Sequence, residues 1–182
     1  MKKTLIIVSL AVAMITNCQK AIAVTKTDFL AKNAVKQTTN PLVAVYSDYF
    51  NLKNVLAKDD GKTAQTTAQA LYDDIAKVPM DKLSADQHEV WMKYEKKLSF
   101  DAEHIKGVDE NKHQREHFVS LSKNMHEVMK VIKGDKVVYY QHCPMYNKGK
   151  GANWLSLESK ISNPYYGKSM SSCGSTAETI KN

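Results

Sequence analysis

The stretch that decides the fold is DENKHQREHFVSLSKNMHEVMKVI, residues 109–132. Its large apolar side chains recur at intervals of three, four, three and four residues, a spacing that gathers them on one face of an α-helix. These side chains are Phe118, Leu121, Met125, Val128 and Ile132. Gly134 follows shortly after and is typical of a helix end. We therefore predict an amphipathic helix that contributes one apolar face to a core.

Three segments upstream show the same helical period of apolar residues. They cover residues 42–56, about 62–77 and 84–106. The last begins at Ser84-Ala85-Asp86-Gln87, a capping box in which the Ser84 and Gln87 side chains accept hydrogen bonds from each other's backbone amides. Four amphipathic helices with short connections favour an antiparallel up-down arrangement. The predicted fold class is all-α, an antiparallel four-helix up-down bundle over about residues 40–133.

The sequence changes character after Gly134. The remaining residues hold most of the glycines and both cysteines that lie beyond the first 23 residues. Residues 137–140 are predicted to be extended, and residues 176–181 to form one or two closing helical turns. We expect an irregular C-terminal segment, about residues 137–182, that packs on the bundle.

The N-terminal residues are typical of a secretory signal. Lys2-Lys3 is basic, residues 5–15 are almost entirely apolar, and Ala21-Ile22-Ala23 offers the small residues that signal peptidase requires. The apolar run is shorter than the roughly 20 residues of a membrane-spanning helix. We predict a signal peptide at 1–23 and one exported, periplasmic domain at 24–182.

Cys18 leaves an alternative, because bacterial lipoproteins are cut just before a cysteine that then receives lipid. The protein would in that case be an outer-membrane lipoprotein, and a membrane is an expected partner only if Cys18 is lipidated. Asn17 is larger and more polar than the small residue usual at that position. Cleavage after Ala23 is therefore favoured.

The charge balance argues against a nucleic-acid partner. The whole chain carries a formal charge of +7 at pH 7. Loss of residues 1–23 would remove three lysines and no acidic residue, so 23 basic and 19 acidic residues remain, a net charge of +4. Basic and acidic residues are interleaved along the helices, whereas a nucleic-acid-binding protein gathers its lysines and arginines on one face.

The strongest candidate for chemistry is a group of soft donors in the C-terminal segment. It consists of His142, Cys143, Met145, Met170 and Cys173. Thiolates and thioethers select Cu(I) or Ag(I) over hard cations. Zinc fits less well, because it does not use thioethers and only the two cysteines and one histidine would remain as ligands.

A disulfide between Cys143 and Cys173 is the alternative interpretation, since disulfides persist outside the cytoplasm. It would close a loop of about 31 residues and contribute roughly 3.5–4 kcal/mol in the chain-entropy treatment. Both methionines would then belong to the core. The residues alone leave the metal site and the disulfide open.

A second candidate lies on the helix at 109–132. His113 and His117 are four residues apart and share one face, as metal-binding histidines often do. The neighbouring Phe118 points to the core, so His117 is expected beside the buried seam and His113 nearer solvent. A hydrogen-bonded structural role for both is the competing interpretation.

Enzyme signatures are absent from the sequence. It contains no glycine-rich phosphate loop, no nucleophile elbow and no H-E-x-x-H. The cysteines are not in the C-x-x-C spacing of thiol oxidoreductases. We therefore predict a binding module and not an enzyme.

The C-terminal segment resembles a known family. The residues that carry the resemblance are VYYQHCPM at 138–145, ANWLS at 152–156, ISNPYYG at 161–167 and MSSCG at 170–174, with QREHF at 114–118 followed by Leu121-Ser122. The family is an exported domain of unknown function that occurs alone and fused to periplasmic adaptor subunits of copper/silver efflux pumps. The resemblance covers about residues 40–181.

This resemblance implies handling of Cu(I) or Ag(I), and it favours metal binding over a purely structural disulfide. The implied ligands are His142, Cys143, Met145, Met170 and Cys173, with His117 as a further donor. The implied role is capture, buffering or delivery of the metal ion to a periplasmic efflux adaptor or another envelope protein. Trp154 and the Tyr165-Tyr166 pair would shield the site from water.

Overall fold

The structure is a computed structural model that describes residues 40–181. The expected signal peptide at 1–23, the cleavage site after Ala23 and the alternative anchor Cys18 lie outside the described residues. Within 40–181, no helix combines the length and the apolar character needed to cross a membrane.

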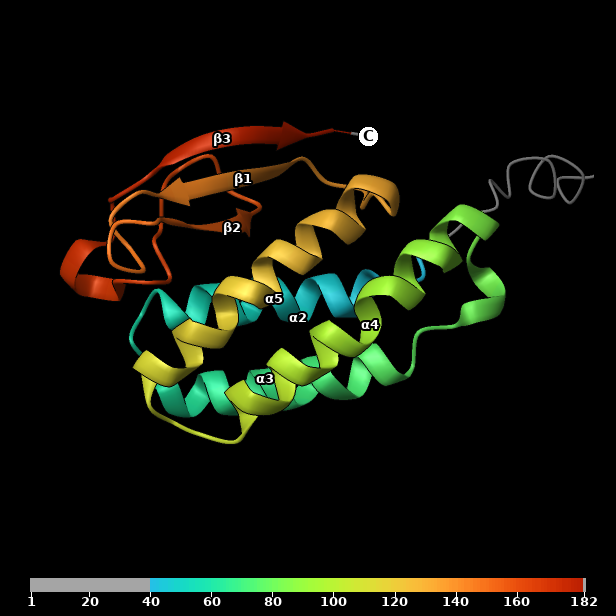
Figure 1. The fold of residues 1–182 in the computed structure, drawn as a ribbon, viewed down its shortest axis with the longest axis horizontal. Helices are drawn as coiled ribbons and strands as arrows, with labels where there is room; N and C mark the ends of the chain where they lie inside the picture. The colour runs from blue at the N-terminus through green and yellow to red at the C-terminus, as the bar shows by residue number, and fades with distance from the viewer. Residues whose placement is uncertain (1–39, 182) are drawn as a thin grey trace, which may run out of the picture. The chain divides into compact units, whose positions relative to one another are not determined.

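The four predicted helices are present in this part of the chain (Figure 1). They are α2 (Val43–Leu56), α3 (Gly61–Ala76), α4 (Ala85–Lys106) and α5 (Asn111–Val131), with a short 3-10 turn, η1 (Met80–Lys82), between α3 and α4. The capping box of α4 is confirmed. Ser84 Oγ accepts from the Gln87 amide at 3.4 Å, and Gln87 Oε1 accepts from the Ser84 amide at 3.1 Å.

The apolar face predicted for α5 is buried. Its five members are Phe118, Leu121, Met125 and Val128, each 0% exposed, and Ile132, 1% exposed. Burial of side chains of this size stabilises the fold by about 1.5–3 kcal/mol each. Successive helices pack on one another, α2 on α3, α3 on α4 and α4 on α5, so this face becomes the centre of a shared core.

The prediction of an all-α fold with an irregular C-terminal segment is wrong, because this segment contains regular β-structure. It forms a three-stranded antiparallel sheet in the order β2-β1-β3. The strands are β1 (Val138–Cys143), β2 (Ala152–Ser156) and β3 (Ser175–Ile180), with a 3-10 turn, η2 (Gly167–Met170), before β3. The extended run expected at 137–140 is confirmed as part of β1.

The prediction of helical turns at 176–181 is wrong, because β3 occupies most of these residues and pairs with β1. Val138 lies opposite Ile180, and His142 lies opposite Ser175. A six-residue segment has too few positions for its period to distinguish a helix from a strand. The pairing with β1, which is distant in sequence, decides the conformation instead.

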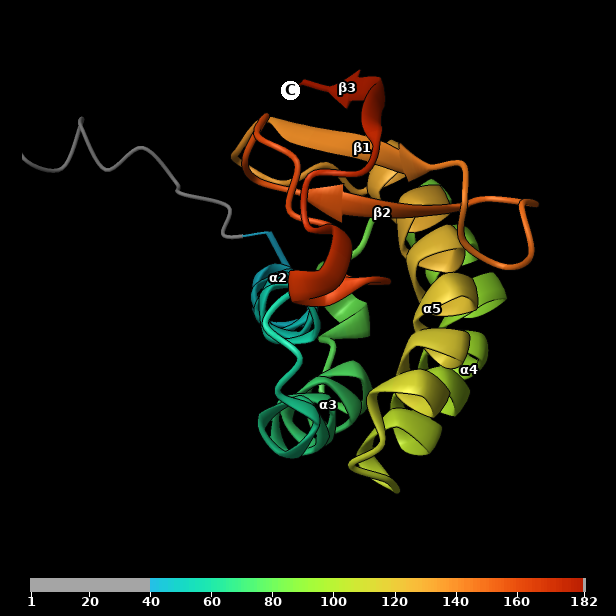
Figure 2. The same cartoon turned by 90° about the vertical axis from the view of Figure 1, so that its left-hand side faces the viewer.

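The sheet lies on one side of the helices, with β2 nearest to them (Figure 2). Strand β2 packs against α5 and α2. Tyr49 of α2 joins the three elements, since its hydroxyl oxygen lies 2.7 Å from Ser122 Oγ on α5 and accepts from the Leu155 amide of β2 at 3.0 Å. The C-terminal segment is thus bound to the helices through the buried core.

A polar clamp holds the segment between β2 and β3 on the helices. Arg115 donates to the Pro164 carbonyl at 2.7 Å and to the Leu56 carbonyl at 2.8 Å, and it pairs with Asp59. Asp59 also accepts from the Lys168 amide at 2.9 Å. Partial burial acts to raise the pKa of Asp59, but the hydrogen bonds from Arg115 and the Lys168 amide outweigh it and hold the pKa below its ordinary value.

Candidate metal centre

The two cysteines of the C-terminal segment lie together. Cys143 is the last residue of β1, and Cys173 stands two residues before β3 begins. Because His142 pairs with Ser175 across the two strands, Cys173 is carried to the end of β1. The Cys143 and Cys173 sulfurs are 3.5 Å apart, and both cysteines are free thiols. A disulfide would require a separation of about 2.05 Å, so the sulfurs are in contact and not bonded.

The thiol pair is open on one side. Cys143 is fully buried, whereas Cys173 is partly exposed. The Cys143 thiol, in hydrogen-bond contact, raises the pKa of the Cys173 thiol, and desolvation adds to this effect. Cys173 therefore holds its proton at neutral pH, and a metal that bound there would displace it.

Two methionines are connected to the thiols by short lengths of chain. Met145 follows Cys143 by two residues, and its backbone carbonyl accepts from the Tyr166 hydroxyl at 3.1 Å. Its side chain is 53% exposed, so the thioether is free to turn. Met170 closes a turn with Cys173, whose amide donates to the Met170 carbonyl at 3.2 Å. Both methionines are thus near a cysteine in sequence, and hydrogen bonds hold their backbone carbonyls in place.

The side chain of His142 lies on the face of β1 opposite to that of Cys143. Adjacent residues of a strand point to opposite faces, so the side chains of His142 and Cys143 diverge. The His142 ring instead pairs through Nδ1 with Asn153 Oδ1 at 3.0 Å. Gly151, at a φ of +78°, lets this ring lie against the backbone, because a Cβ there would collide with it.

His117 also lies apart from the thiols. Its Nδ1 is 3.3 Å from Asp101 Oδ1 on α4, and its ring stacks on that of His104. The next residue, Phe118, is the one that turns towards the C-terminal segment, where its ring approaches Tyr165. Of the six predicted ligands, the structure thus brings Cys143 and Cys173 into contact and pairs His142 and His117 with other residues. Met145 and Met170 are near the cysteines in sequence.

A cluster of aromatic side chains lies beside the segment that carries Cys173. Trp154 and Tyr165 are buried, and their rings meet edge to face at 6.0 Å. Gly174, next to Cys173, lies so near the Trp154 ring that a Cβ would approach it to 2.9 Å. Trp154 and Tyr165 were predicted from the sequence, whereas Tyr146, whose ring stacks on Tyr165 at 4.5 Å, was not. Its position directly after Met145 was the available signal.

Among residues 40–181, no three or more His, Cys, Asp and Glu side chains stand in an arrangement that could hold a metal ion without side-chain movement. A metal at the thiol pair would therefore need thioether, backbone or solvent ligands in addition. This requirement matches the chemistry of soft monovalent ions better than that of zinc, which uses cysteine, histidine and carboxylate ligands.

A family model described as "Protein of unknown function (DUF3347)" matches residues 45–136, half of the chain. The chain belongs to the DUF3347 family. The relation to a family of unknown function is thereby confirmed for these residues, while its connection to copper and silver efflux stays a prediction. No curated protein and no solved structure matches the chain.

The match places the family's shared region on the helices of this DUF3347 protein. Residues 45–136 run from the first turn of α2 to just before β1. The thiol pair and the sheet lie beyond the matched residues. The resemblance to residue 181 stays a prediction for the sheet.

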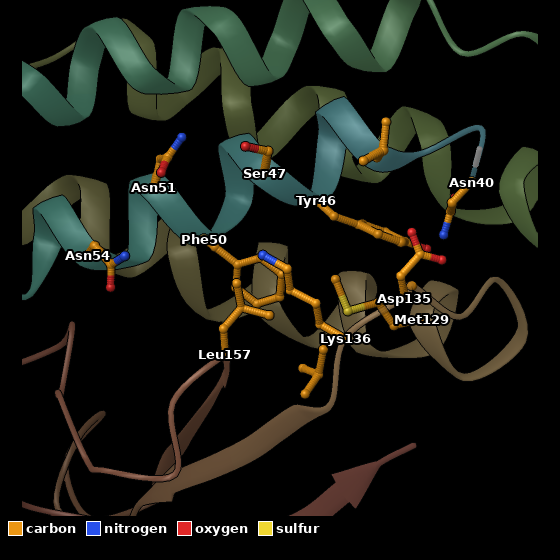
Figure 3. Close-up of a pocket in the computed structure, with 13 residues that line it drawn as sticks. Asn40, Tyr46, Ser47, Phe50, Asn51, Asn54, Met129, Asp135, Lys136 and Leu157 are labelled. Atoms are coloured by element: carbon orange, nitrogen blue, oxygen red, sulfur yellow. The ribbon is translucent and has the colours of Figure 1, made fainter. Parts of the chain in front are cut away.

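The DUF3347 helices also border a groove that the sequence analysis missed (Figure 3). It has a volume of about 390 Å³ and lies between α2 and the start of β1, with Tyr46, Phe50, Met129 and Leu157 among its lining residues. Val138, at the opposite end of β1 from Cys143, lines it too. A six-residue strand spans about 17 Å, so groove and thiols are separate features. Residues from three distant segments build the groove, which is why no local pattern indicates it.

Proposed function

We propose that this protein captures Cu(I) or Ag(I) outside the cytoplasm at Cys143 and Cys173, and buffers it or passes it to an efflux partner. The observation that supports the proposal is the contact of two free thiols at 3.5 Å, at the open edge of the C-terminal segment. Soft thiolate donors favour these ions. No catalytic step belongs to the proposal.

The separation of the sulfurs supports a site with more than two ligands. With metal–sulfur bonds of about 2.3 Å, two sulfurs 3.5 Å apart subtend an angle of roughly 100° at the metal. Two-coordinate Cu(I) prefers a linear arrangement, whereas this angle is near that of three- or four-coordinate sites. At least one further donor is therefore needed on the exposed side of Cys173.

Met145 and Met170 are the proposed further donors. Each is within three residues of a thiol, and the solvent-exposed side chain of Met145 can turn towards Cys173 without disturbing the core. The buried aromatic rings of Trp154 and Tyr165 would exclude water from the inner side. In this proposal the helices form the up-down bundle that their short connections predict, and act as a rigid support for the sheet.

An anaerobic Cu(I) titration against a competing chelator tests the proposal. We expect one Cu(I) per chain, and Cys173→Ser should weaken binding roughly 100-fold, equivalent to about 2.8 kcal/mol. Met145→Leu should weaken it about tenfold, equivalent to about 1.4 kcal/mol. Met92→Leu is the matched control, because Met92 is 49% exposed on α4 and has no cysteine beside it.

A domain stapled by a Cys143–Cys173 disulfide, which binds a partner protein and no metal, is the second candidate. The same 3.5 Å contact favours it, since only a small movement would join the sulfurs. Intact-mass measurement of protein purified without reductant distinguishes the two. A deficit of two hydrogens, with no Cu(I) uptake after reduction, would exclude the metal proposal.

A further inference from the structure

Three histidines meet on the surface of the α4–α5 pair, apart from the thiols. The rings of His104 on α4 and His117 on α5 stack with centroids 4.4 Å apart and planes 26° from parallel. The His113 ring, one turn before His117, lies 4.9 Å from it. His117 is thus the centre of a row of three imidazoles.

The hydrogen bonds of these rings select one tautomer. His104 Nδ1 lies 2.9 Å from the Phe100 carbonyl, which can only accept, so this nitrogen carries the proton. His117 Nδ1 lies 3.3 Å from the carboxylate oxygen Oδ1 of Asp101 and donates likewise. In the neutral form of either ring the lone pair therefore resides on Nε2, the nitrogen that metals bind when Nδ1 is anchored in this way.

The anchor of His117 is itself held in place. Asp101 is only 4% exposed, and its Oδ1 also accepts from Ser120 Oγ at 2.7 Å. A buried carboxylate behind an imidazole fixes the tautomer and the orientation of the ring. In carboxylate–histidine–metal sites, the carboxylate holds one ring nitrogen while the metal binds the other, as Asp101 and the free Nε2 of His117 would allow.

We propose that His104 and His117 bind a borderline divalent cation, such as Zn²⁺, through their Nε2 atoms, and that His113 turns in as the third ligand. Imidazole ligands suit this class of ion, whereas the thiol and thioether set suits Cu(I). The proposal is therefore independent of the function proposed for Cys143 and Cys173.

The rings must turn before they can bind a metal. In residues 40–181, no three His, Cys, Asp or Glu side chains are arranged for metal binding as they stand. Two nitrogens on one tetrahedral Zn²⁺ are roughly 3.3 Å apart when the Zn–N bonds are about 2.0–2.1 Å. The ring centroids are 4.4 Å apart, so the proposal requires the two rings to tilt until their Nε2 atoms reach this separation. The His113 side chain is 41% exposed, so it can rotate without unpacking the core.

Calorimetric titration of the Cys143→Ser/Cys173→Ser variant with Zn²⁺ at pH 7.5 tests this site with the thiols removed. We expect one Zn²⁺ per chain. His117→Gln and His104→Gln should each weaken binding about tenfold or more, as loss of a metal ligand does. His88→Gln, an exposed histidine elsewhere on α4, is the control and should have no effect.

Imidazole ¹⁵N shifts give a second measurement that does not depend on any histidine substitution. Zn²⁺ should shift the Nε2 resonances of His104 and His117 and leave those of His88 unchanged. Absence of Zn²⁺ binding tighter than about 1 mM would overturn the proposal. So would binding that His104→Gln and His117→Gln both leave intact. Neither result would alter the Cu(I) proposal, because the thiols are absent from this variant.

Discussion

Replacement of Tyr49 by phenylalanine removes one hydroxyl that joins three elements. The hydroxyl lies 2.7 Å from Ser122 Oγ on α5 and accepts from the Leu155 amide of β2 at 3.0 Å, and all of Tyr49 is buried. The Leu155 N–H would be left in the core without its partner, which costs about 1–3 kcal/mol. The Ser122 hydroxyl can instead bond to a backbone carbonyl of its own helix, so its loss of the Tyr49 partner costs less free energy than that of the Leu155 N–H. We expect a total loss of about 2–4 kcal/mol in the free energy of unfolding.

Urea denaturation followed by circular dichroism measures this loss, and a melting temperature lower by roughly 8–16 °C should accompany it. Tyr72→Phe is the control, because Tyr72 is only partly buried on α3. A loss below about 0.5 kcal/mol, the usual range for a surface change, would contradict this prediction. It would mean that the sheet is not fastened to the helices through this hydroxyl.

Three further predictions concern the core and the polar clamp. Leu121→Ala should lower the free energy of unfolding by about 2–5 kcal/mol in a denaturation curve, because Leu121 is 0% exposed and a cavity would remain. Gly167→Ala should cost at least about 1–2 kcal/mol by the same measurement, since Gly167 has a φ of +55° and a Cβ would collide with Asp59; an unchanged midpoint would contradict this. Asp59→Asn should cost up to about 1 kcal/mol at pH 7. Since the folded-state pKa of Asp59 is lowered, its contribution is present above about pH 4 and is lost as the pH falls through the folded-state value, so variant and wild type should converge in acid. A difference that stays constant as the pH falls through the acid range would show that the charge of Asp59 is not responsible.

The helices were predictable because their signals are local. The apolar period of α5 and the capping box at Ser84 lie within one or two turns of the residues that they organise. The structure buries the predicted side chains and confirms the cap. The match to the DUF3347 family covers this same helical region.

The candidate site was only partly predictable. Cys143 and Cys173 could be considered together because they are the two cysteines beyond the first 23 residues. Their distance could not be predicted, because it depends on the pairing of β1 with β3. His142 was placed with the thiols because it is adjacent in sequence, and the pleat of β1 turns it to the other face. His104 showed no pattern in the sequence, because its partner His117 lies on a different helix.

Local sequence patterns were sufficient to predict the four amphipathic helices, their approximate ends and the soft donors of the C-terminal segment. Only the tertiary structure decided that this segment is a sheet, that two sulfurs lie 3.5 Å apart at its edge, and that a row of histidines spans α4 and α5. The physical reason is the range of the interactions. Helical hydrogen bonds and caps join residues three or four apart, whereas strand pairing and side-chain contacts between elements join residues that the chain alone does not bring together.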